Sequence, residues 1–220
     1  MFIPSLPLSD RRAPPVFLKI AFSLLCSAST LAFAQTPANV TEKSLSNVFS
    51  QQVFYNIPSG FSNQLLSERA NDTNYIHERG LIGENADNWT QVITVTGLKN
   101  TAANKNLTPM TLIGTIVLNF QKTCPTSFAG TKFMESTMGN GIPVAVAVLS
   151  CGTIKNKSET TLITAIKGSN DYYTVQWAER GKASKKPLKI DEKKWVERLN
   201  LLAPGIQNPS TQAPAKKAKR

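Results

Sequence analysis

The alternation of apolar and polar residues predicts a domain built largely from short β-strands. Residues 89–96 alternate between an apolar face and a threonine-rich face, which is the period of two expected for an antiparallel strand with one solvated side. The turn-forming residues 83–88 precede this strand. Residues 142–151 are apolar on both faces, and such a strand is usually central and covered on both sides. Shorter strands are predicted at 52–57 and 74–78.

Two segments carry the signals of helix ends. Thr108 followed by Pro109 is a hydroxyl N-cap with proline at the first helical position, and apolar residues recur near helical spacing from there to Cys124. Gly114 and several β-branched residues keep a strand as the alternative for this segment. A second helix is predicted at 191–202, with an aspartate cap at its start and Pro-Gly after its end.

A hairpin completes the set of predicted elements. Residues 160–167 and 172–178 flank a Gly-Ser-Asn-Asp turn, whereas 63–69 is ambiguous. The order of elements is therefore β, β, β, α, β, β, β, α. This order predicts an α+β fold with a single antiparallel sheet and two helices packed on it.

The first 34 residues have the layout of a secretory signal. Basic residues at Arg11, Arg12 and Lys19 precede an apolar run at 20–33, and a small-x-small motif ends at Ala34. We predict cleavage after Ala34 and export to the periplasm or the cell exterior. A membrane anchor is the alternative, but the apolar run is shorter than the roughly 20 residues that span a bilayer. The processed chain is not expected to be transmembrane.

Cysteine usage agrees with an oxidising location. Cys26 lies in the leader, so Cys124 and Cys151 remain as a pair in the processed chain. We predict one disulfide between them, and two buried free thiols are the alternative. With only these cysteines and the lone His77 as soft ligands, no metal site and no cofactor are expected.

These features predict four parts along the chain. Residues 1–34 form the cleaved signal and residues 35–50 a flexible N-terminal segment. Residues 51–203 form the α+β domain. Residues 204–220 are predicted to be a disordered basic tail, because Pro, Gln, Ser, Ala and Lys dominate there.

The chain is strongly basic, with 25 Lys and Arg against 14 Asp and Glu and a net charge of +11 at pH 7. Four basic residues lie within the last five positions: Lys216, Lys217, Lys219 and Arg220. Such a tail can hold an exported protein to an anionic surface such as lipopolysaccharide, teichoic acid or phospholipid headgroups. A tail that only aids solubility is the alternative. Export argues against a nucleic-acid partner.

The spacing of reactive residues assigns no catalytic residue. His77 and Glu78 are neighbours in a predicted strand, so their side chains point to opposite faces, and a surface or half-buried histidine is the simpler interpretation. Glu78, Glu84 and Asp87 lie close in sequence and paired carboxylates cleave glycosidic bonds, but nothing fixes their separation. Trp89 stands on an apolar face, which favours core packing over ligand stacking. The candidate ligand or partner surface comprises Glu78, Arg79, Glu84, Asp87 and Trp89.

Five stretches carry a family resemblance: ER at 78–79, GE at 83–84, DNWTQVITV at 87–95, AIKG at 165–168 and YYTVQW at 172–177. With these stretches the chain resembles a group of small uncharacterised secreted proteins of Gram-negative bacteria. The resemblance covers most of residues 70–203, includes the cysteine pair and implies a periplasmic or extracellular location. The export signal, the basic charge and the lack of a recognisable catalytic set lead us to predict an exported, non-enzymatic protein that binds an envelope protein or an anionic surface component. A hydrolase of cell-envelope polymers and a secreted effector are the alternatives.

Overall fold

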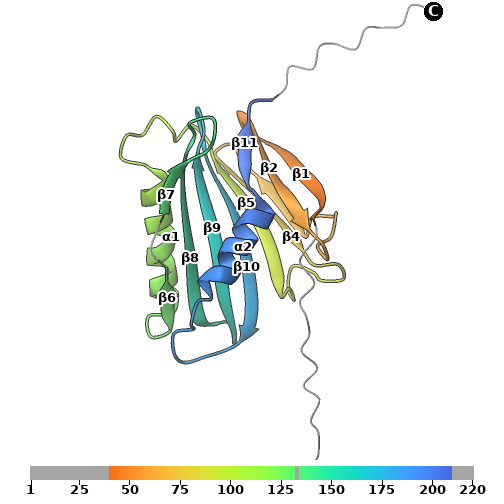
Figure 1. Cartoon of the computed structure of the whole chain (residues 1–220), viewed down its shortest axis with the longest axis vertical. Helices are drawn as coiled ribbons and strands as arrows, with labels where there is room; N and C mark the ends of the chain where they lie inside the picture. The colour runs from red at the N-terminus through yellow and green to blue at the C-terminus, as the bar shows by residue number, and fades with distance from the viewer. Residues whose placement is uncertain (1–39, 132–133, 210–220) are drawn as a thin grey trace, which may run out of the picture. The chain divides into compact units, whose positions relative to one another are not determined.

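The computed structural model describes residues 40–131 and 134–209, which form two antiparallel sheets and two helices (Figure 1). The small sheet has the strand order β1-β2-β11, where the strands are β1 (Val40–Val48), β2 (Gln51–Pro58) and β11 (Gly205–Gln207). The large sheet has eight strands in the order β3-β4-β5-β10-β9-β8-β6, with β7 also paired to β8. Its strands are β3 (Ser67–Ala70), β4 (Asn74–Gly80), β5 (Gln91–Leu98), β6 (Phe128–Gly130), β7 (Met134–Thr137), β8 (Pro143–Ile154), β9 (Lys157–Lys167) and β10 (Tyr172–Lys182).

The prediction of a single-sheet α+β fold is therefore wrong, because the chain forms two sheets and is mostly β-structure. The predicted flexible segment 35–50 contains β1, and the predicted tail 204–220 begins with β11. In β1, Ser44 is buried while Leu45 is 51 % exposed, so apolar periodicity does not mark this strand. Pairing with β2 supplies its hydrogen bonds, and β11 joins the other edge of β2. Neither pairing leaves a signal in the local sequence.

Both predicted helices are confirmed. Helix α1 (Pro109–Thr123) begins at the N-cap Thr108, whose hydroxyl oxygen accepts a hydrogen bond from the Thr111 amide at 3.1 Å, and this excludes the strand alternative for the segment. Helix α2 (Glu192–Leu202) begins at Asp191, whose carboxylate accepts a hydrogen bond from the Lys194 amide at 3.2 Å. None of the helices in the described part of the chain is long and apolar enough to span a membrane.

The two helices lie on opposite faces of the large sheet, over β8, β9 and β10 (Figure 1). On one face, Leu112 and Ile113 of α1 pack against Ala145 and Ala147 of β8, whose small side chains let the helix approach. On the other face, Trp195 of α2 packs against valines of β8 and a leucine of β9. The prediction that 142–151 is a strand covered on both sides is confirmed.

The small sheet packs on the same face as α2. Tyr55 and Ile57 of β2 contribute to a core that also contains Tyr173, Val175 and Trp177 of β10. All five side chains are at most 3 % exposed. A pair of sheets that buries aromatic side chains in this way gains about 25 cal/mol for each Å² of apolar surface removed from water.

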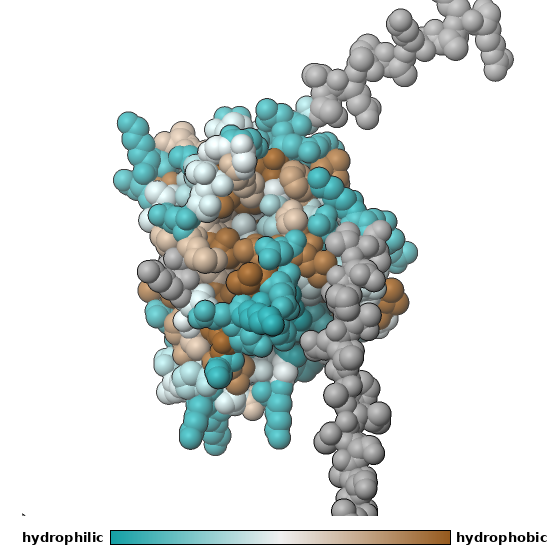
Figure 2. Space-filling view, in the orientation of Figure 1, coloured by the Kyte–Doolittle hydropathy of each residue, from teal (hydrophilic) through white to brown (hydrophobic). Residues whose placement is uncertain are grey.

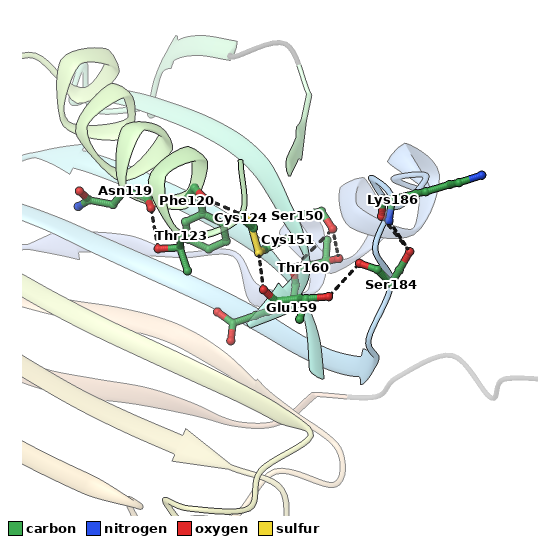
Figure 3. Close-up of a disulfide and its surroundings, with 11 residues drawn as sticks. Asn119, Phe120, Thr123, Cys124, Ser150, Cys151, Glu159, Thr160, Ser184 and Lys186 are labelled. Carbon is green, nitrogen blue, oxygen red and sulfur yellow. Dashed lines mark hydrogen bonds between the residues drawn. A yellow bond between two sulfur atoms is a disulfide. The ribbon is translucent and has the colours of Figure 1, made fainter. Parts of the chain in front are cut away.

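The predicted disulfide between Cys124 and Cys151 is present, with 5.8 Å between the two Cα atoms (Figure 3). It joins the residue that follows α1 to the carboxyl half of β8. The close-up shows the polar residues of the β8–β9 end gathered around it. The bridge therefore fastens α1 to the strand that its apolar face already covers.

A chain of buried polar groups crosses the interface between the sheets. The Tyr75 hydroxyl donates to Glu68 Oε1 at 2.6 Å, so His77 Nδ1 is the donor in its 3.0 Å bond to the Tyr75 oxygen. The Nε2 atom of the neutral ring then accepts from the Tyr55 hydroxyl at 3.4 Å, and that hydroxyl accepts from Arg79 Nε at 3.0 Å. Every proton in this chain therefore points from Arg79 toward Glu68.

Burial decides the protonation state of His77. Its side chain is fully buried, which corrects the prediction of a surface or half-buried histidine. Burial, together with the nearby Arg79 cation, lowers the pKa of His77 from 6.5 to about 4, against the weaker opposing effect of Glu68. The imidazole is therefore neutral at neutral pH, and its Nε2 atom can accept the hydrogen bond from the Tyr55 hydroxyl.

Lowering the pH from 7 to 5 should reduce the free energy of unfolding by about 2 kcal/mol. The unfolded imidazole binds a proton below pH 6.5, whereas the folded one does not do so until about pH 4. This stability is fully present above pH 6.5 and is lost as the pH falls toward 4. Urea unfolding at the two pH values measures the change. His77→Asn, which does not titrate, should remove most of it.

The same prediction has an independent spectroscopic test. His77 is the single histidine of the chain, so its ring signals in an NMR spectrum need no assignment by mutation. They should show a neutral ring down to pH 5 in the folded protein. A midpoint near 6.5 in the folded state would contradict the buried, neutral imidazole.

Replacing both disulfide cysteines by alanine should lower the free energy of unfolding by about 3 kcal/mol. The two cysteines are 27 residues apart, and the bridge restricts a loop of that length in the unfolded chain. Urea unfolding of the double variant measures the loss. Reduced wild-type protein should show the same loss, and an undiminished free energy in either form would contradict the prediction.

Candidate functional site

Basic side chains gather at the end of the large sheet where β8 turns into β9 and where β10 ends. Lys155 occupies the turn, Lys157 begins β9 and Lys182 ends β10. Lys157 and Lys182 are direct partners in the β9–β10 register, so their side chains project from the same face. Like charges placed directly opposite each other destabilise a sheet. The pairing of Lys157 with Lys182 therefore costs stability.

The segment after β10 folds back onto this end of the sheet. The Ser184 amide donates to the Gly152 carbonyl oxygen at 2.7 Å, and the Thr153 hydroxyl donates to the Ser184 carbonyl oxygen at 2.9 Å. A Cβ atom at Gly152 would come within 2.7 Å of the Lys186 carbonyl oxygen, so this close approach requires glycine. This segment, which carries Lys185 and Lys186, therefore packs against the end of β8, and Figure 2 shows hydrophilic side chains extending from this end of the sheet.

Arg180 is the most constrained cation of the group. Its guanidinium carbon lies 3.6 Å from the ring centre of Trp89, and its Nε atom donates to Glu159 Oε2 at 3.1 Å. Lys157 Nζ donates to the Asn88 side-chain oxygen at 3.2 Å. The loop that precedes β5 therefore packs against the cations of β9 and β10. Stacking on the Trp89 ring and pairing with the Glu159 carboxylate hold the Arg180 guanidinium in one orientation.

A hollow of about 430 Å³ lies between these groups. Its lining consists of Thr90, Asn156, Lys157, Arg180, Gly181, Lys182 and Ala183. The lining contains three cations and no carboxylate. A recess lined by one sign of charge concentrates ions of the opposite sign.

We name this cluster the basic end, and it comprises Lys155, Lys157, Arg180, Lys182, Lys185 and Lys186. Among the residues that the structure describes, Glu159 is the one carboxylate that ion-pairs with any member of it. The other carboxylate with cationic partners, Glu179, pairs with Lys194 and Arg198 of α2 and holds that helix on the sheet. Although burial raises the pKa of Glu179, its hydrogen bonds to Arg198 and Lys194 lower it more. Five of the six cations at the basic end are therefore left without an ion pair.

The structure does not bring the predicted candidate surface together. Arg79 is buried between the sheets, where it donates to the Ser62 carbonyl oxygen. Glu78 accepts from the Ser67 hydroxyl at 2.7 Å on the other face of β4. Glu84 caps the Thr90 amide at 2.9 Å, and Asp87 is exposed in the preceding turn.

Trp89 alone among these five residues contacts the basic end. It is 8 % exposed and packs in a small core with Val92 and Ala178, as the core interpretation of the sequence predicts. The terminal cations Lys216, Lys217, Lys219 and Arg220 lie outside the described residues, as does the leader with its expected cleavage point at Ala34. Within 40–131 and 134–209, no three His, Cys, Asp or Glu side chains are placed to hold a metal ion.

Sequence reasoning missed the basic end, although one signal was available. Residues 180–189 contain five basic and no acidic residues. The run is too irregular to predict a helix or strand face, and its partners Lys155 and Lys157 lie more than twenty positions earlier. The hairpin of β9 and β10 and the Ser184 hydrogen bond to Gly152 create the cluster.

No protein-family model matches the sequence, and no curated protein is significantly similar to it. A similar solved structure is that of a protein of unknown function from Pseudomonas aeruginosa, with 9 % sequence identity over 63 % of this chain and 83 % of that chain. Its TM-score of 0.35 is too low to support an argument about fold or function. The functional assignment therefore rests on the chemistry of the basic end itself.

Proposed function

We propose that this protein is exported and binds a phosphate-bearing anionic component of the bacterial envelope through the basic end. The observation that carries the proposal is the register pairing of Lys157 with Lys182 in a cluster of six cations that has a single carboxylate partner. Folding places these like charges together at a cost in stability. A polyanion that lies across the end of the sheet would offset that cost.

The proposed location is supported by two independent features. The leader at 1–34 has the charge and hydropathy layout of a secretory signal. The disulfide between Cys124 and Cys151 is of the kind that persists in oxidising compartments. In such compartments the abundant polyanions are phospholipid headgroups, lipopolysaccharide and teichoic acid, which all carry phosphate groups.

The composition of the basic end suits a repeating or mobile anion better than a single small one. Five of its six cations are lysines, whose flexible stems and compact charges accept phosphate from many directions. Arg180, which Trp89 and Glu159 hold in place, adds a guanidinium group with a fixed orientation. The basic residues of the terminal tail are tethered to the same domain, so they would add to the affinity by raising the effective concentration of positive charge.

Lys157→Gln/Lys182→Gln should weaken binding to phosphatidylglycerol vesicles about 30-fold, because each lysine near an anionic membrane contributes about 1 kcal/mol. Vesicle cosedimentation at low and high ionic strength measures this effect, and higher salt should weaken wild-type binding. The matched control is Lys99→Gln/Lys105→Gln, which removes the same charge at the opposite end of the sheet. If both double variants lost the same affinity for the vesicles, net charge alone would explain the binding, and the proposed site would be wrong.

The contribution of the tail requires a truncation that spares the fold. A chain that ends at Pro209 keeps β11, whereas a chain that ends at residue 203 loses this strand from the small sheet. Binding that is abolished by truncation after Pro209 and unchanged in Lys157→Gln/Lys182→Gln would place the anion site in the tail. Neutral phosphatidylcholine vesicles should bind neither form.

Lys155→Gly, in the turn between β8 and β9, should lower the affinity for anions without lowering the stability of the protein. Lys155 and Asn156 have φ values of 46° and 68°, as a two-residue type I′ hairpin turn requires, and lysine is disfavoured there. The variant should therefore unfold at equal or higher urea concentration, with up to about 1 kcal/mol gained, while its affinity for phosphatidylglycerol vesicles falls about fivefold. Asn156→Gly, the charge-neutral control in the same turn, should keep its affinity. A Lys155→Gly variant with unchanged affinity would exclude this lysine from the site.

A further inference from the structure

A second hollow lies on the α1 face of the large sheet, away from the basic end. Helix α1 packs on β8, β9 and the first residue of β10, Tyr172, and the hollow lies between the helix and the strands β4, β5 and β10. The space between the helix and these strands has a volume of about 430 Å³, within the range of small-molecule sites. It shares no lining residue with the hollow at the basic end.

Apolar side chains form two sides of this hollow. Leu112 and Ile116 come from α1, and Ile76 and Leu98 come from β4 and β5. Ile76, Leu98 and Ile116 are each only partly buried. Partly exposed apolar side chains that face one another across a recess favour a ligand with an apolar body.

Polar groups occupy the rest of the lining in fixed positions. The hydroxyls of Thr96 and Thr174 are 2.7 Å apart across β5 and β10, and Gln176 Nε2 donates to the Thr174 hydroxyl at 2.9 Å. Arg69 is the one charged residue in the lining, and it is the register partner of Ile76. Among the described residues, no carboxylate forms an ion pair with Arg69. The hollow thus combines an apolar recess with one cation, Arg69, that has no ion-pair partner among the described residues.

We propose that this hollow binds a small amphiphilic monoanion, with its apolar body between α1 and the sheet and its anionic group at Arg69. The single cation matches a single anionic group, and Ile76, the register partner of Arg69, provides apolar surface next to it. This site is independent of the proposed binding of polyanions. Its ligand is small and partly apolar, whereas the basic end accepts an extended array of charges.

Two fluorescent probes of the same shape test the proposal. 8-Anilino-1-naphthalenesulfonate carries an apolar body with one anionic group, and N-phenyl-1-naphthylamine has the same body without the charge. The sulfonate should bind the full chain with one-to-one stoichiometry. Arg69→Gln should weaken its binding about tenfold and change the binding of the neutral probe less than twofold, because the lost contact is a charge-assisted hydrogen bond. Lys105→Gln is the charge-matched control.

A second variant tests the apolar body site. Ile116→Trp should fill the hollow and weaken both probes, and the partly exposed position allows the larger side chain. Leu118→Trp is its control, because Leu118 is 56 % exposed on the same helix and does not line the hollow. Circular dichroism and urea unfolding verify that each variant retains the wild-type fold.

The outcomes separate this site from the basic end. Sulfonate binding that survives Lys157→Gln/Lys182→Gln but weakens in Arg69→Gln and Ile116→Trp supports the proposal, as do NMR shift changes confined to β3, β4, β5, the first half of β10 and α1. Binding lost in Lys157→Gln/Lys182→Gln alone, equal effects of Ile116→Trp and Leu118→Trp, or no binding to the wild-type protein would each overturn it. None of these outcomes changes the interpretation of the vesicle experiments, which test the basic end separately.

Discussion

The burial of β8 and β9 on both faces is the constraint on which the rest of this structure depends. Alanines at Ala145 and Ala147 bring α1 close on one face, and Trp195 of α2 covers the other. The disulfide fastens the end of α1 to β8. Because α1 packs on β8, β9 and the start of β10, no helix covers β4 and β5 on this face. The hollow near Arg69 exists for that reason.

The charged groups of this protein fall into two classes, which are buried groups with hydrogen-bond partners and exposed cations with few partners. Arg79 is buried, but its donors are used within the hydrogen-bond chain that runs through Tyr55 and His77 to the Glu68 carboxylate, so its burial is compensated. The basic end instead collects exposed cations that have few internal partners. Buried polar groups that are fully satisfied belong to the stability of the two-sheet interface. Exposed like charges that folding forces together indicate a function, because packing alone gives no reason to keep them.

The two proposed sites divide the open face of the large sheet between them. Even-numbered residues of β10 run along this face from Thr174 and Gln176 beside the helix to Arg180 and Lys182 at the basic end. Along this face of β10, Thr174 and Gln176 are followed by the cations Arg180 and Lys182. The same surface thus changes from the recess proposed for a small amphiphile to the edge proposed for a polyanion.

Local sequence determined both helices with their caps, the β9–β10 hairpin, the doubly covered strand at 142–151 and the cysteine pair, because caps, turn residues and apolar periodicity act over a few neighbouring positions. It also predicted that Trp89 is a core residue, but not its neighbours, because Trp89 precedes β5 and packs with Val92 and Ala178 while Ile93 and Val95 face the other core. The second sheet depended on tertiary structure, since the polar strand β1 and the three-residue strand β11 acquire their hydrogen bonds only from β2. The full burial of His77 and the union of Lys157 with Lys182 were likewise decided by pairing between distant segments, because a side chain's partner across a sheet or a sheet interface is absent from its own stretch of sequence.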